Sequence, residues 1–94
     1  MSRLNRVVLD VLKPHTPDIV GFARMLADRA APCEVHVRVA GVDAKTETII
    51  VEVRGDNIDH ATITAAIADL GGSVHSVDEV SIDSRPPGRG TRGS

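Results

Sequence analysis

The chain has 94 residues, a mass of 10.0 kDa and 41% hydrophobic residues, a composition typical of one small folded domain. Residues 1–84 hold all 13 acidic residues and 8 of the 11 basic ones, so this part carries a net charge of -5. The only aromatic residue, Phe22, argues against a base-stacking surface for nucleic acid. The single cysteine, Cys33, excludes an internal disulfide and a multi-thiolate zinc site, and no apolar run is long enough to span a membrane.

The two ends of the chain carry little information about function. The first residues lack the long apolar stretch of a secretory signal, so we expect a cytoplasmic location. Residues 85–94 contain three arginines, two prolines and no apolar side chain that could anchor them. They are predicted to form a disordered tail after a folded domain of residues 1–84. A weak basic arm for nucleic acid or an acidic partner is the alternative interpretation.

The first third of the chain predicts a strand followed by a helix. Residues 4–13 alternate between apolar and polar, which is typical of a β-strand, and Pro14 ends it. Thr16 is the candidate N-cap of the helix, and Pro17 suits its first position. One apolar stripe runs along this helix at helical spacing: Ile19, Phe22, Ala23, Leu26 and Ala30. Pro32 prevents the helix from continuing.

The middle of the chain predicts two strands, residues 33–42 and 46–54, and a second helix. The turn between these strands is short, so they must be antiparallel neighbours. Asp59 is the candidate N-cap of the second helix, and Gly71-Gly72 supplies its left-handed stop. The apolar stripe of this helix consists of Ile63, Ala66, Ile67 and Leu70.

The last predicted strand covers residues 73–83, where two three-residue steps between valines break strict alternation. A β-bulge near Asp78-Glu79 would restore the pattern. The complete order is β-α-β-β-α-β, which predicts a ferredoxin-like α+β fold. Its sheet has the strand order 4-1-3-2, and both helices cover one face.

Three segments of the sequence are similar to a known family. They are residues 9–15 (LDVLKPH), 55–59 (GDNID) and 71–80 (GGSVHSVDEV). Together they resemble the domain of unknown function 211 family, and the resemblance covers residues 4–83. It implies a ferredoxin-like fold and assembly into closed homo-oligomeric rings, with no established activity. The Arg/Gly/Pro tail departs from the family and inherits no role from it.

The predicted sheet leaves one face free of helices, and that face is a candidate metal site. It carries two histidines and two carboxylates on neighbouring strands: Asp10, His36, Glu52 and His75. These ligand types suit zinc, iron or nickel. The alternative is an exposed or interfacial face on which Asp10 and Glu52 pair with Arg38, Arg54 or a protonated histidine.

Three further groups of residues are weaker candidates. A hard cation could use five carboxylates near the second helix and the last strand: Asp56, Asp59, Asp78, Glu79 and Asp83. Lys13 and His15 could hold a phosphate or carboxylate, although we prefer a solvated Lys13 and a His15 bonded to the backbone. Cys33 is interpreted as a packed thiol, because no base is evident near it.

The function expected from the sequence is self-assembly without catalysis. No serine or cysteine has the context of a nucleophile. The predicted edge strands, residues 33–42 and 73–83, contain no proline, so each offers unpaired backbone groups to another chain. The predicted ring interface consists of Val74, Val77, Val80 and Ile82. The alternative is a small-ligand-sensing regulatory domain with its ligand bound between subunits; neither nucleic acid nor membrane is expected as a partner.

Overall fold

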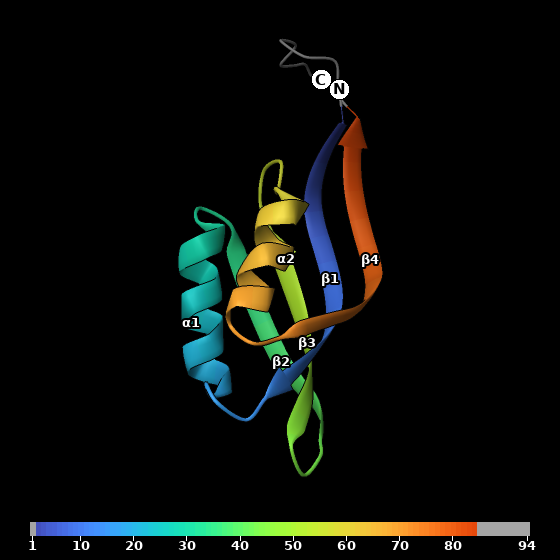
Figure 1. The fold of residues 1–94 in the computed structure, drawn as a ribbon. Coiled ribbons are helices and arrows are strands. Elements are labelled where there is room, and N and C mark those ends of the chain that lie inside the picture. The colour runs from blue at the N-terminus through green and yellow to red at the C-terminus, as the bar shows by residue number, and fades with distance from the viewer. Residues whose placement is uncertain (1, 85–94) are drawn as a thin grey trace.

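The computed structural model describes residues 2–84 of the chain, and the predicted tail of residues 85–94 lies outside them. The elements follow the order β1 (Ser2–Pro14), α1 (Ile19–Ala30), β2 (Glu34–Val42), β3 (Thr46–Arg54), α2 (His60–Asp69) and β4 (Ser73–Ser84). The strands form one sheet in the order β2-β3-β1-β4, with every neighbouring pair antiparallel. Both helices lie on one face of this sheet (Figure 1). The ferredoxin-like α+β fold and its strand order are therefore confirmed.

The hydrophobic core fills the space between the helices and the sheet, and its centre is formed by β1 and β3. The buried residues of these two strands are Val7, Leu9, Val11, Ile49, Val51 and Val53. The helices contribute Phe22, Leu26, Ala30, Ile63, Ala66 and Ile67. These sets match the alternation of the two strands and the centre of each predicted helical stripe, whereas Ile19, Ala23 and Leu70 of the stripes are only half-buried. The hydropathy pattern therefore predicts the inward faces correctly but extends both stripes beyond the fully buried residues.

The two helices begin at aspartates. The N-cap of α1 is Asp18, whose carboxylate accepts a 2.9 Å hydrogen bond from the Gly21 N–H. The prediction of Thr16 as this cap was wrong by two residues, because the aspartate is the stronger capping residue and lies closer to the stripe. Asp59 caps α2 as predicted and accepts from the N–H groups of Ala61 and Thr62.

The end of α2 and the whole of β4 owe their geometry to local backbone irregularities. Gly71 has φ +88°, and its N–H donates to the Ala68 carbonyl, so it supplies the predicted left-handed stop. Along the β1–β4 ladder, Asp78 is an extra residue between the pairs Val8–Glu79 and Leu9–Val77. The predicted β-bulge is therefore confirmed. Two further irregularities, at His75 on β4 and at Asn5 on β1, were not predicted.

Candidate functional site

The four apolar residues of β4 lie on the helix side of the sheet, beside the core strand β1. Their partners on β1 form the pairs Val11–Val74, Leu9–Val77, Val7–Val80 and Leu4–Ile82. Residues directly opposite in an antiparallel pair project from the same face. Asp78 and His75 are each an extra residue without a partner on β1. The three-residue spacing between successive valines of β4 therefore corresponds to a two-residue spacing on β1. As a result, the three valines point the same way as the core.

These residues, Val74, Val77, Val80 and Ile82, form what we call the β4 stripe. Val77, Val80 and Ile82 expose 49%, 54% and 60% of their surface, whereas Val7 and Leu9 on β1 are fully buried. The cause is the position of the helices: α1 packs over β2 at the opposite edge of the sheet, and α2 contacts β4 without covering these three side chains (Figure 1). Val77, Val80 and Ile82 therefore form an apolar surface that the described part of this chain leaves uncovered.

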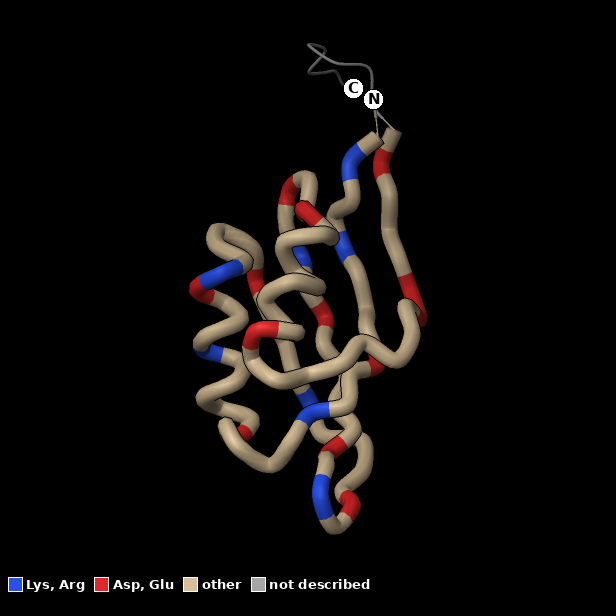
Figure 2. The backbone as a smooth tube through the Cα atoms, viewed as in Figure 1, with Lys and Arg blue, Asp and Glu red and all other residues tan. Residues whose placement is uncertain are grey.

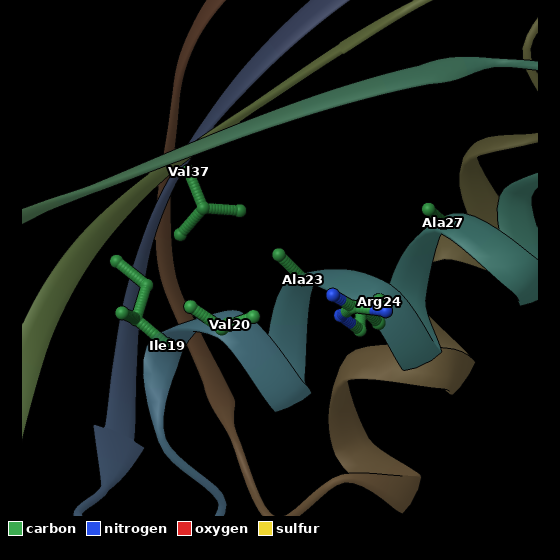
Figure 3. A pocket seen from close by; sticks show the side chains of 6 residues that line it. All are labelled: Ile19, Val20, Ala23, Arg24, Ala27 and Val37. Carbon is green, nitrogen blue, oxygen red and sulfur yellow. The ribbon is translucent and has the colours of Figure 1, made fainter.

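A second apolar surface lies between α1 and β2. A shallow groove of about 380 Å³ is lined by one strand residue and five helix residues: Ile19, Val20, Ala23, Arg24, Ala27 and Val37. Figure 3 shows Ile19 and Ala23 extending from the helix toward the gap below Val37, with Arg24 beside them on the helix. We call this surface the α1–β2 groove. The groove was not predicted from the sequence, although the apolar Val20 and Ala27 beside the buried stripe of α1 indicate an apolar surface there.

The open face of the sheet separates the four candidate metal ligands into two pairs. Asp10 and His75 line one hollow with Leu12 and Thr48. His36 and Glu52 line a different hollow, together with a second glutamate and an arginine of β2 and β3. Among residues 2–84 no three His, Cys, Asp or Glu side chains lie close enough to hold a metal ion. The predicted four-ligand site therefore does not form within one chain.

The register of the strands explains this separation. Glu52 lies opposite His36 on one side and Val8 on the other, so Asp10 is two residues further along β1. The Glu52 carboxylate also accepts hydrogen bonds from the Arg6 and Arg54 guanidinium groups. The bonds from Arg6 and then from Arg54 lower the pKa of Glu52 below its ordinary value. The alternative prediction, that Glu52 forms ion pairs on this face, is therefore confirmed for its partner Arg54. Its second partner, Arg6, was not predicted.

The predicted acidic cluster is also dispersed. Asp56 accepts a hydrogen bond from Arg3, Glu79 accepts one from Arg6, and Asp59 caps α2. Asp78 accepts a 2.6 Å bond from the Ser76 hydroxyl. Asp56 and Asp59 precede α2, whereas Asp78, Glu79 and Asp83 lie on β4, and within the described part of the chain no three of these side chains come close enough to hold a cation. They therefore form no cation site in a single chain.

Lys13 and His15 meet at Glu47, near the turn between β2 and β3. The Lys13 ammonium group is fully buried and donates to Glu47 at 3.1 Å and to the Pro14 carbonyl at 2.8 Å. Solvation of Lys13 was a wrong prediction, because the alternation of β1 continues one step further and turns this side chain inward. His15 contacts the carbonyls of Asp43 and Ala44, as predicted, and also Glu47.

Both ring nitrogens of His15 lie beside oxygen acceptors: Nδ1 beside the Glu47 carboxylate and Nε2 beside two backbone carbonyls. A protonated imidazole carries an N–H on each nitrogen and can donate to both sides. The hydrogen bond to Glu47, followed by that to the Ala44 carbonyl, raises the pKa of His15. The bonds from His15 and then Lys13 lower the pKa of Glu47. The cluster thus fastens the β2–β3 turn to the end of β1. It engages these side chains internally instead of presenting them to an anion.

Cys33 is half-buried and packs against the hydrophobic core. This environment agrees with the interpretation of a packed thiol. Among the helices formed by residues 2–84, none has the length and apolar character needed to cross a membrane.

The fold defines the class of this protein, a small ferredoxin-like α+β protein, and comparison with known sequences gives its family. The family model DUF211, described as "Uncharacterized ArCR, COG1888", matches residues 5–85. The chain therefore belongs to the DUF211 family. It is also 40% identical over 80 residues to uncharacterized protein MJ0319 of Methanocaldococcus jannaschii, an alignment that covers 85% of this chain and 82% of that protein. The resemblance stated from the three sequence segments is confirmed, and the family has no known activity.

Proposed function

We propose that this protein is a non-enzymatic module that assembles with copies of itself into a closed ring, with the β4 stripe on one side of each contact. The observation that carries the proposal is the exposure of Val77, Val80 and Ile82 on the same face as the buried core of β1. Burying apolar surface is favourable by about 25 cal/mol per Å². A protein of only 94 residues gains much from covering such a stripe.

The strand that carries the stripe also favours association. β4 is an edge strand of twelve residues, from Ser73 to Ser84, without a proline. One side of its backbone therefore offers hydrogen-bonding groups that no strand of its own sheet uses. An edge that pairs with a different surface of the next copy produces a head-to-tail contact, and repetition of that contact closes into a ring.

Catalysis is not part of the proposal, because the shifted titratable groups have structural partners. Glu52, His15 and Glu47 lie in ion pairs or hydrogen bonds that join strands, and Asp59 caps a helix. A catalytic group would lie in a cleft beside a nucleophile or a substrate-sized cavity. We place the assembly in the cytoplasm, since a chain with one cysteine has no disulfide framework that requires an oxidising compartment.

Val80→Asp tests the proposal, because it introduces a charge in the middle of the β4 stripe. Val80 is 54% exposed, so we expect the protomer to fold while the assembly dissociates. Light scattering on the full chain should then give a mass near 10.0 kDa. Met25→Asp is the matched control, since Met25 is 40% exposed but lies outside both apolar surfaces. Equal masses for Val80→Asp and wild-type protein would contradict the proposal.

A second candidate function is a small-ligand sensor, favoured by the two hollows on the open face of the sheet. The hollow beside Asp10 and His75 measures about 330 Å³, and the one beside His36 and Glu52 about 200 Å³. A ligand that binds only the assembled form raises its melting temperature. A thermal-shift screen of metabolites and divalent cations at fixed protein concentration tests this function. Absence of any shift contradicts it.

A further inference from the structure

The partner of the β4 stripe follows from how the two edges of the sheet are built. β2 and β4 are the edge strands, and each neighbouring pair between them is antiparallel. Three reversals separate them, so β2 and β4 run in opposite directions. If two copies stand side by side in the same orientation, β4 of one meets β2 of the next as an antiparallel pair. That is a regular way to extend a sheet by one strand.

This arrangement also aligns the two apolar surfaces. The helix sides of both sheets then face the same way, so the β4 stripe of one copy comes beside Val37 of the next. The α1–β2 groove is lined by Val37 and by residues of α1, the helix that packs over β2 (Figure 3). Within its own chain, α2 contacts β4 but leaves Val77, Val80 and Ile82 exposed. Cover for these three side chains is then supplied by α1 of the neighbour.

The β4 strand is acidic, whereas the α1–β2 groove carries one positive charge. β4 contains Asp78, Glu79 and Asp83 and no basic residue, and Figure 2 shows only acidic positions along this strand. Arg24 lies on the lining of the α1–β2 groove. None of the ion pairs found among residues 2–84 uses Arg24. Glu79 and Asp83 lie opposite Val8 and Arg3 of β1 and project from the face without helices, so they add long-range negative charge at this edge and form no direct ion pair with Arg24.

From these observations we propose that the α1–β2 groove binds the β4 stripe of a second copy of this chain. The inference rests on the proposed self-assembly and specifies its contact. Two different surfaces meet, so each subunit has one donor side, β4, and one acceptor side, the groove between α1 and β2. A contact between two β4 strands would instead stop at a dimer, because it uses the same surface twice.

Two single variants and their mixture test the pairing. Val20→Asp charges the groove, and Val80→Asp charges the stripe; both side chains are more than half exposed, at 55% and 54%. Each variant alone should lose the assembly. In an equal mixture, the intact stripe of Val20→Asp can still occupy the intact groove of Val80→Asp. We therefore expect a heterodimer with twice the 10.0 kDa chain mass, measured by sedimentation equilibrium over a concentration series.

The outcomes separate the two proposals. If Val20→Asp keeps the wild-type mass while Val80→Asp dissociates, self-assembly stands and the groove is not the acceptor. A mixture no heavier than its separate components also overturns the pairing. A wild-type chain that is itself monomeric contradicts the proposed function as well. Circular dichroism checks that each variant folds, and Arg24→Glu, an exposed substitution, provides a second groove variant that should weaken assembly. Met25→Asp should keep the wild-type mass.

Discussion

β1 and β4 present the same kind of apolar side chain on the same face of one sheet, with opposite results. Leu9 and Val77 lie directly opposite each other, yet Leu9 is fully buried and Val77 is 49% exposed. The difference comes from the helix layer: α1 packs over β2, and α2 contacts β4 but leaves Val77 exposed (Figure 1). An apolar residue on a strand therefore identifies a face that needs cover. What provides the cover, the same chain or another one, depends on the arrangement of the helices.

The sharpest way to test this comparison is to truncate both members of the pair. Leu9→Ala removes buried methyl groups and leaves a cavity, so it should lower the free energy of unfolding by about 2–5 kcal/mol. Val77→Ala in the dissociated protomer should change it by less than about 0.5 kcal/mol, because its side chain already contacts water. Urea unfolding in the Val80→Asp background measures both values. Equal losses would mean that β4 is covered within its own chain.

The next largest effect concerns Lys13, the one charged side chain buried among the residues that the structure describes. Glu47→Gln removes its anionic partner and leaves a buried ammonium group without charge compensation, which is strongly destabilising. Lys13→Met combined with Glu47→Gln removes both charges and should be less destabilising than Glu47→Gln alone. Thermal unfolding of the two variants decides the order. The reverse order would show that Lys13 reaches water in solution.

A smaller effect tests where the covering helix α1 begins. Asp18→Ala removes the acceptor for the Gly21 N–H and should cost about 0.5–2 kcal/mol of stability. Thr16→Ala should have almost no effect, since this residue lies two positions before the observed cap. Urea unfolding of both variants is the measurement. A larger loss for Thr16→Ala would restore the prediction made from the sequence.

The smallest expected effect depends on pH and involves His15. Because its pKa is raised, its contribution to stability is complete below the ordinary value of 6.5 and is lost as the pH rises through the folded-state pKa. Glu47, with a lowered pKa, contributes above its ordinary 4.5 and loses that contribution as the pH falls through the folded-state value. The difference in melting temperature between wild type and His15→Asn should therefore be largest between pH 4.5 and 6.5. A difference that is constant at all pH values contradicts this assignment.

The fold could be predicted from the sequence because it depends on patterns that are local. Alternation in β1 and helical spacing in α1 and α2 identify the core, and even the irregular valine spacing of β4 predicts the bulge at Asp78. The site was harder to predict, because strand register decides which side chains meet. Glu52 and Asp10 lie on the same face of the sheet, but Glu52 pairs with Val8, two residues before Asp10 on β1. Glu52 also forms an ion pair with Arg6, so it does not join Asp10 in one site.

The burial of Lys13 also could not be predicted from the sequence alone, because it depends on how two strands pair. Its charge predicts exposure, whereas the period of β1 predicts an inward direction, and the cross-strand pairing with Glu47 decides between them. The α1–β2 groove was missed for a related reason. Val20 and Ala27 look like ordinary surface residues of a helix until the neighbouring strand, with Val37, is in place.

The most direct test of the account is the native mass of the full wild-type chain. Native mass spectrometry and sedimentation at micromolar concentration measure it without any substitution. If other copies cover the β4 stripe in a closed ring, the protein should occur as one discrete species of at least about six subunits. Its mass should be a multiple of 10.0 kDa and should not change with concentration. A single species of 10.0 kDa would contradict the claim that β4 is completed by another copy of the chain.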